Sequence, residues 1–135
     1  FAMQQLAERG LATPERLAAV RASGILRVLN DNQPRRDQPY QLMQLVQFNW
    51  FLDQGLLTKN ADGFLEIHDE KYAATVASLL EETIALQLAG DPAAAEKFFT
   101  RWTDWQPGLH EAIGKRMRDA QTTRYALVRY AALGE

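Results

Sequence analysis

The chain has 135 residues and a formal net charge of −2, and 47% of its residues are hydrophobic and 24% charged. This composition supplies one folded core and is too apolar for a disordered segment. The charge gives no global attraction to nucleic acid or to an anionic membrane, and the absence of cysteine excludes disulfides and thiolate chemistry. The longest uncharged stretch, residues 38–52, is too short to span a bilayer, and no signal peptide is visible at Phe1. We therefore expect a cytoplasmic protein with no membrane or nucleic-acid partner.

The chain begins in a pattern typical of the middle of a helix. Residues 1–9 look helical, and Gly10 is the stop signal. Nothing caps the start of this helix, as expected of a helix that begins upstream. We expect residues 1–135 to form a single helical domain from the C-terminal part of a larger protein.

A second helix is predicted after a clear start signal. Residues 13–15, Thr-Pro-Glu, supply a hydroxyl N-cap, a proline in the first turn and an acid near the positive end of the helix dipole. Apolar residues continue at roughly helical spacing to about Leu29. Residues 30–39, with two prolines and several charges, predict an exposed loop.

The middle of the chain predicts a central helix and a hairpin. The helix at residues 40–54 has apolar side chains on more than one face, which indicates packing on several sides, and Gly55 ends it. The apolar runs that follow flank Asp62 and Gly63, an Asp-Gly pair that is a hairpin signal at residues 56–67.

Further helices are predicted after the hairpin. Asp69 is a candidate N-cap for a helix at about 70–88, and Gly90 suits a left-handed C-cap. Asp91 then caps a new helix that starts at Pro92. Four residues are expected to form the buried face of this helix: Ala95, Phe98, Phe99 and Trp102.

The last helix predicted spans about residues 108–120. Residues 122–132 mix helix and strand signals, so their secondary structure is left open. The fold class expected is therefore mainly α, a bundle-like lobe of about five to six helices with one small β-hairpin at about 56–67.

The order of these elements resembles the helical C-terminal part of the dipeptidyl peptidase III family of zinc metallopeptidases, some of whose relatives are attached to Nudix-type domains. The likeness spans roughly Phe1 to Arg116. The segments that carry it are Phe1–Leu6, Pro14–Leu29, Asn49–Trp50, Leu56–Ile67 and Gly90–Asp91.

The resemblance implies a parent protein that cleaves dipeptides from peptide N-termini. Its zinc would be held by two histidines and a glutamate that lie outside this chain. We therefore expect no catalytic, cofactor-binding or metal-binding residue in this segment, which alone is not catalytic. Its partners would be the N-terminal catalytic part of the same polypeptide and, for the parent, a peptide substrate.

One departure from the family concerns Tyr40 and Gln44. Counted back from Trp50, they stand where well-known members carry a histidine and an arginine that face the active-site cleft. The departure implies different transition-state contacts, a different substrate or an inactive parent, although a tyrosine hydroxyl can still donate a hydrogen bond to an oxyanion. The simpler interpretation, which we favour, makes Tyr40 a helix-start aromatic and Gln44 a surface residue.

The string from His110 and Glu111 to Lys115 invites comparison with the family's zinc signature, H-E-x-x-G-H. Zinc needs a second neutral nitrogen, and the ammonium of Lys115 has no free lone pair. The other histidine, His68, precedes a different helix. We therefore expect a solvated helix face with His110 near its start.

Two further clusters have a functional and a structural interpretation. Trp102 and Trp105 with Arg101 are typical of a stacking platform for bases, but more often of a helix–helix core, which we favour. The basic residues Lys115, Arg116, Arg118, Arg124 and Arg129 are expected to form a solvated face rather than an anion site.

Two alternatives to the peptidase lobe stay open. The joint at residues 86–95 also resembles a single tetratricopeptide-type helix hairpin, which would make the chain a non-enzymatic helical interaction module. Such modules need about three stacked repeats, and we find one. The other alternative is the lobe of a peptidase-like scaffold that has lost activity, which Tyr40 and Gln44 suggest.

Overall fold

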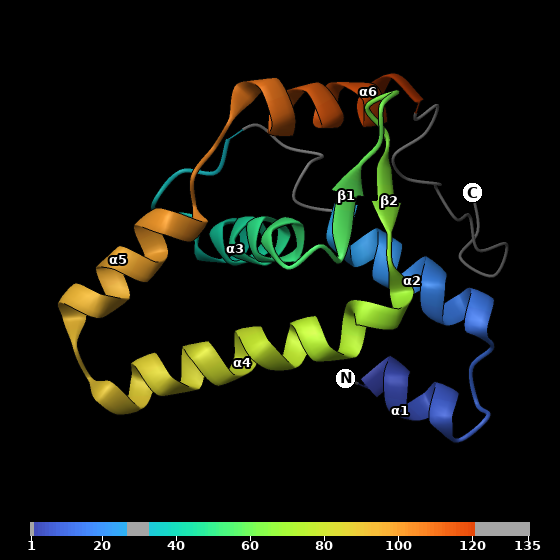
Figure 1. Cartoon of the computed structure of the whole chain (residues 1–135), viewed down its shortest axis with the longest axis horizontal. Coiled ribbons are helices and arrows are strands. Elements are labelled where there is room, and N and C mark those ends of the chain that lie inside the picture. The colour runs from blue at the N-terminus through green and yellow to red at the C-terminus, as the bar shows by residue number, and fades with distance from the viewer. Residues whose placement is uncertain (1, 27–32, 121–135) are drawn as a thin grey trace, which may run out of the picture.

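A computed structural model describes residues 2–26 and 33–120. This part of the chain is mainly α-helical with one two-stranded antiparallel hairpin, which confirms the expected fold class (Figure 1). The elements are α1 (Ala2–Glu8), α2 (Pro14–Leu26), α3 (Pro39–Asp53), β1 (Leu57–Lys59), β2 (Leu65–Ile67), α4 (Tyr72–Ala89), α5 (Pro92–Trp102) and α6 (Ala112–Ala120). A 3₁₀ turn, η2 (Asp69–Lys71), precedes α4, and a π-helical turn, η3 (Pro107–Glu111), precedes α6.

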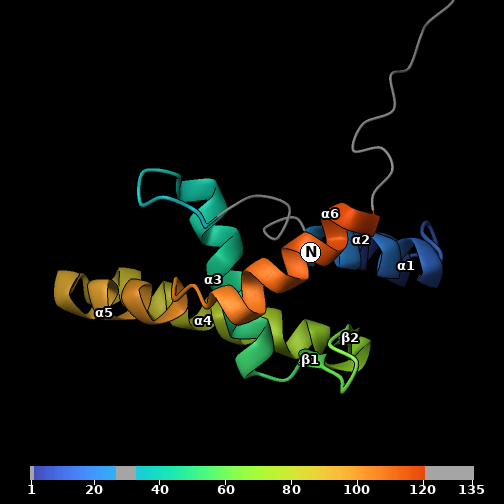
Figure 2. The same cartoon turned by 90° about the horizontal axis from the view of Figure 1, so that it is seen from above.

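Helix α3 lies at the centre of the molecule. Figure 1 shows it nearly end-on, with α4 below, α5 to the left, α6 above and the hairpin to the right. The view from above shows α3 between α5 on one side and α2 on the other (Figure 2). Six of its residues are buried, as expected for a helix that is apolar on several faces: Leu42, Leu45, Val46, Phe48, Trp50 and Phe51.

The core joins α3 to the helices and the hairpin around it. The ring of Trp50 lies 4.7 Å from that of Trp102 in α5, and its indole Nε1 donates to Ser78 Oγ of α4 at 3.2 Å. Leu56 and Leu57, where the chain leaves α3 for β1, are almost completely buried. Trp102 is buried and Trp105 packs against the same cluster, so the expected core role of the two tryptophans is confirmed.

The hairpin and the joint between α4 and α5 follow their sequence signals. Gly63 and Gly90 have left-handed backbone angles, with φ of 79° and 60°. Asp91 Oδ1 accepts a hydrogen bond from the Ala93 N–H at 2.8 Å, and Pro92 is the first residue of α5. The hairpin turn predicted at Gly63 and the caps predicted at Gly90 and Asp91 are therefore present.

Two local predictions are wrong. Asp69 does not cap a helix, because its carboxylate pairs with the guanidinium of Arg21 at 3.0 Å and the helix proper starts at Tyr72. Ala95 is exposed, whereas Phe98 and Phe99 are half-buried and Trp102 is buried. Alanine fits either face of a helix, so the larger side chains decide which face turns inward.

Residues 122–132, for which the sequence did not decide between helix and strand, lie outside the described residues. Within the described ranges, no helix is long and apolar enough to cross a membrane.

Candidate functional site

The first two turns of α3 carry the residues at which the sequence departs from its resemblance. The side chain of Tyr40 is 80% exposed and that of Gln44 is half-buried. This arrangement agrees with a helix-start aromatic and a residue at the helix surface.

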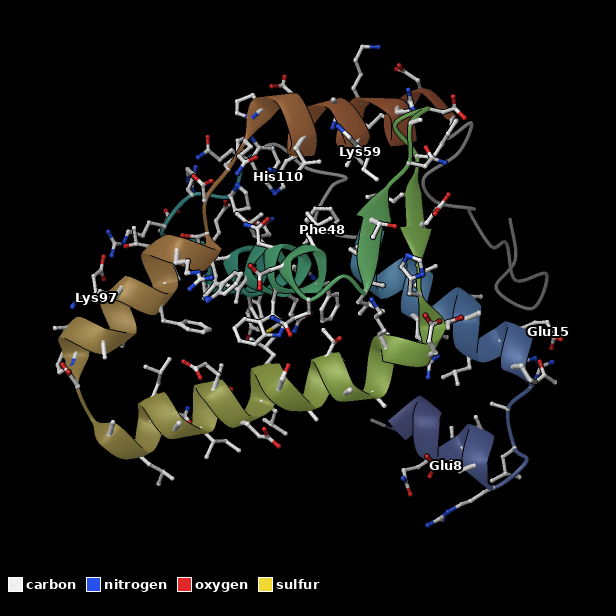
Figure 3. All side chains as sticks on the ribbon, in the orientation of Figure 1. Glu8, Glu15, Phe48, Lys59, Lys97 and His110 are labelled. Atoms are coloured by element: carbon white, nitrogen blue, oxygen red, sulfur yellow. The ribbon has the colours of Figure 1, made fainter. Side chains whose placement is uncertain are left out.

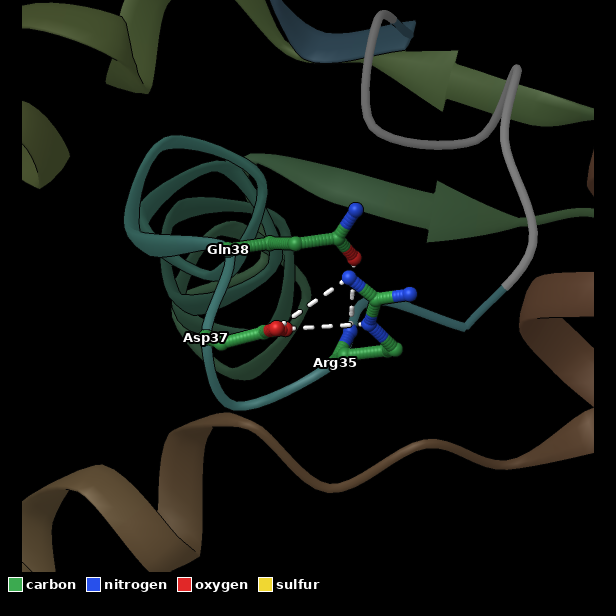
Figure 4. Close-up of polar contacts among 3 residues, drawn as sticks. All are labelled: Arg35, Asp37 and Gln38. Carbon is green, nitrogen blue, oxygen red and sulfur yellow. Dashed lines mark hydrogen bonds and ion pairs between the residues drawn. The ribbon is translucent and has the colours of Figure 1, made fainter.

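The loop before α3 is held by a small polar arrangement (Figure 4). The guanidinium of Arg35 makes two hydrogen bonds to the carboxylate of Asp37, at 3.0 and 3.1 Å, and its backbone N–H donates to Gln38 Oε1 at 2.8 Å. Arg35 and Asp37 are both well exposed, so this pair sets the local geometry and contributes little free energy.

An apolar groove of about 580 Å³ lies between α3, α4 and α5. We call it the α3–α4 groove; it is lined by Arg36, Pro39, Leu42, Met43, Val46, Gln47, Val76, Leu79, Leu80, Thr83 and Phe99. Its size is that of a small-molecule site. Its charged rim residue, Arg36, is already engaged, because it pairs with Glu96 and lies 5.5 Å over the ring of Phe99. The groove therefore has the shape of a binding site but holds no group suited to acid–base or nucleophilic chemistry.

A group of hydrogen bonds in the described structure joins α3 to the segment before α6. The Asn49 amide donates from Nδ2 to the carbonyl oxygens of Trp102 and Asp104, both at 2.9 Å. Its Oδ1 lies 2.7 Å from His110 Nε2. One side chain of α3 thus contacts the end of α5, the following loop and η3. Figure 3 shows His110 and Phe48 in this region, between the ribbon of α3 and the segment above it.

The partners of His110 assign its tautomer. The Asn49 Nδ2 group must face the two carbonyl oxygens, because only the nitrogen can donate to them. Its Oδ1, an acceptor, therefore faces the imidazole, and Nε2 of His110 carries the proton. On the other side of the ring, Nδ1 accepts from the Gln106 backbone N–H at 2.9 Å. Both ring nitrogens of a neutral imidazole are therefore satisfied, as a buried histidine requires.

His110 is 1% exposed, so the predicted solvated position is wrong for this residue. Its ring stacks on Trp105 with centroids 4.8 Å apart and lies 5.6 Å from the ring of Phe48. Burial lowers the pKa of His110 below its usual value of 6.5, and the Gln106 carbonyl and the Asp104 carboxylate oppose that shift. Sequence reasoning missed this residue, although its position soon after Pro107 and Trp105 is a signal of a packed turn.

The histidines of the described residues do not fit a zinc site. His110 uses both ring nitrogens within the protein, and His68 Nε2 is 2.9 Å from Thr58 Oγ1. Within residues 2–26 and 33–120, no group of three or more His, Cys, Asp or Glu side chains is placed to hold a metal ion. No step of metal chemistry is therefore assigned to these residues.

The basic residues of α6 lie on the surface, as predicted for Lys115, Arg116 and Arg118. The Lys115 ammonium pairs with Asp119 at 2.5 Å. Arg116 donates to the carbonyl of Asp62 at 3.0 Å and lies 4.6 Å over the ring of Phe64. These contacts tie α6 to the tip of the hairpin. Arg124 and Arg129 lie outside the described residues.

Comparison with known proteins gives one kind of match. No protein-family model matches the chain, and neither does any curated protein. Among solved structures, the chain is similar to dipeptidyl-peptidase III from Corallococcus sp. strain EGB, with a TM-score of 0.68 and 28% sequence identity. The match covers 87% of this chain and 22% of that protein. The chain thus resembles a helical part of dipeptidyl-peptidase III, as its sequence predicted, and it spans about a fifth of the length of that enzyme.

Proposed function

We propose that the chain is the C-terminal helical lobe of a zinc-dependent peptidase of the dipeptidyl peptidase III kind, and that it supports the zinc site and the cleft without carrying the catalytic motif. The observation that supports this role is the structural match over 87% of the chain. The zinc ligands, the catalytic glutamate and the peptide substrate would belong to the rest of the same polypeptide.

A supporting role has a physical basis in the packing of α3. Metal ligands on helices keep their geometry only when those helices are held by well-packed neighbours. The second half of α3 is buried against α4, α5 and the hairpin, which makes it a rigid support. In its first half, the side chains of Tyr40 and Met43 are exposed and are free to face another lobe.

The test uses the whole parent protein and this chain side by side. Sequencing of the coding region upstream of Phe1 is expected to reveal H-E-x-x-G-H followed by a glutamate-bearing helix. The purified parent is then expected to contain stoichiometric zinc and to release dipeptides from peptide N-termini, and this chain alone to do neither. An upstream region without that motif, or a parent that binds no zinc, would reject the proposal.

A second candidate is a non-enzymatic interaction module, which the α3–α4 groove favours. The groove continues onto an exposed apolar row on α4, formed by Leu80, Ile84 and Leu88. Saturable binding of a peptide or protein to this chain alone, lost when Leu80 is replaced by Asp, would support that function. A parent protein whose zinc ligands are intact but that has no peptidase activity would instead support the other alternative, a peptidase-like scaffold that has lost activity.

A further inference from the structure

We propose that the α3–α4 groove and the exposed row beside it form the docking surface for a helix from the catalytic part of the same polypeptide. The row consists of Leu80, Ile84 and Leu88 and is called the α4 row. This inference rests on the proposed function, which makes the chain one lobe of a larger enzyme. It adds the place where the two parts meet and the kind of segment that fills the contact.

The first support is an apolar surface that no described element covers. The groove of about 580 Å³ opens between α3, α4 and α5, and Leu80 belongs both to its lining and to the α4 row. The side chains of the row are 48%, 44% and 83% exposed, in chain order. The row extends over about two helical turns, or about 12 Å. Folded proteins rarely leave a large continuous apolar surface in water, so this surface indicates a protein contact.

The lining of the groove favours a helix over a strand or a loop. Most lining side chains are apolar, and the hydroxyl of Thr83 is already used, because it lies 3.0 and 2.9 Å from two carbonyl oxygens of its own helix. The other polar lining groups are the amide of Gln47 and the guanidinium of Arg36, which pairs with Glu96. An extended segment in this groove would bury backbone N–H and C=O groups without partners. A helix satisfies these groups internally and presents only side chains to the groove.

The charges beside the α4 row define the docked helix further. Helix α4 contains two acidic residues, Glu81 and Glu82, and no lysine or arginine, and both acidic side chains are exposed. Glu81 lies about 60° around the helix from Ile84, so its carboxylate borders the row. A helix whose apolar face is bordered by lysine or arginine fits this surface, since opposite charges at the rim favour docking and fix its register.

The length of the chain favours the same polypeptide as the source of this helix. The match covers 22% of the similar dipeptidyl-peptidase III, so most of that enzyme consists of segments outside the matched part. A helix on the same polypeptide is present at a high effective concentration, and a modest apolar surface is enough to hold it. A separate partner protein, by contrast, would leave the surface uncovered in the purified parent.

Thiol labelling at two adjacent positions of α4 tests the docking surface. The chain has no cysteine, so Ile84→Cys and Ala85→Cys each introduce a single reporter at an exposed position. Adjacent side chains point about 100° apart, so Ala85→Cys is the matched control outside the row. Mass spectrometry of the labelled peptide gives each rate, in the parent and in this chain alone.

The two reporters are expected to respond differently. Ile84→Cys is expected to react at least about tenfold more slowly in the parent than in this chain alone, because a covered site reacts only when the contact opens. Ala85→Cys is expected to react at similar rates in both proteins. Equal rates for Ile84→Cys in the two proteins, or equal slowing of Ala85→Cys, would overturn the proposal.

The zinc and activity measurements on the parent separate this inference from the proposed function. An active parent that contains zinc but leaves position 84 unprotected would reject the docking surface alone. A parent without zinc in which position 84 is protected would reject the peptidase function and support docking by the rest of the polypeptide.

A charge at the same position gives a second measurement. Ile84→Asp places a carboxylate where the docked helix would bury it, and Ala85→Asp adds the same charge outside the row. Both variants are expected to leave the urea midpoint of this chain almost unchanged, because both positions are exposed. In the parent, Ile84→Asp is expected to lower the midpoint and Ala85→Asp to leave it in place. Equal midpoints for the two variants of the parent would contradict the docking surface.

Discussion

Replacement of Asn49 by alanine tests whether one amide joins α3 to the segment before α6. The change removes hydrogen bonds to Trp102, Asp104 and His110. Each is worth about 1 kcal/mol net, and the buried Nε2–H of His110, left unpaired, adds a further cost of about 1–3 kcal/mol. Alanine is a better helix former than asparagine by about 0.6 kcal/mol. Water reaches the half-buried Asn49 and can replace part of its hydrogen bonding, which lowers the loss by about a further 1 kcal/mol. The expected net loss in the free energy of unfolding is about 2–4 kcal/mol.

Urea denaturation at pH 8, where His110 is neutral, measures this loss. A slope of about 2 kcal/mol per molar urea converts it to a decrease in the unfolding midpoint of about 1–2 M. Gln44→Ala is the matched control, because it removes an amide from the same helix at a half-buried position, and its effect is expected to stay within about 0.5 kcal/mol. The double variant Asn49→Ala with His110→Ala is expected to lose less than the sum of the single losses, by about 1 kcal/mol or more.

A loss below about 1 kcal/mol for Asn49→Ala would refute the reasoning. It would mean that water takes the place of the amide at all three partners. Strict additivity in the double variant would refute it in another way, since residues that share a hydrogen bond must be coupled.

Other changes test the joints and the core. Gly90→Ala is expected to cost about 1–2 kcal/mol because φ is 60°, whereas Gly24→Ala, inside α2 with open space around it, is expected to stabilise the chain by up to about 1 kcal/mol. Asp91→Ala removes the cap of α5 and is expected to cost about 1 kcal/mol. Trp50→Ala is expected to cost about 3–5 kcal/mol, the largest loss, because it empties the contact between α3, α4 and α5. Thermal and urea unfolding measure each loss in stability. A smaller loss for Trp50→Ala than for Asp91→Ala would contradict the described core.

The elements that could be predicted from the sequence are those set by local chemistry. The Gly90–Asp91 joint, the glycine at the hairpin tip and the apolar helix at the centre depend on backbone angles, caps and the arrangement of apolar side chains along the chain. Each signal lies within a few residues of the feature that it specifies.

The features that could not be predicted depend on residues far apart in the sequence. His110 is buried because Asn49 lies 61 residues before it and offers the acceptor that its Nε2–H needs. Asp69 fails to cap a helix because Arg21, 48 residues earlier, takes its carboxylate. A polar residue at a helix start has the same local pattern in both situations, so only the tertiary partner decides between a solvated group and a buried one.

Three consecutive residues of α3 explain why a single turn organises most of this lobe. Phe48 faces the ring of His110, Asn49 holds the loop after α5, and Trp50 contacts Ser78 of α4 and Trp102 of α5. Successive helix positions point about 100° apart, so one turn reaches three neighbours. This geometry favours a support over a hinge at the second half of α3, because movement of any one neighbour would disturb contacts with the other two. Tyr40, near the start of α3, lies outside these contacts, because its side chain is 80% exposed.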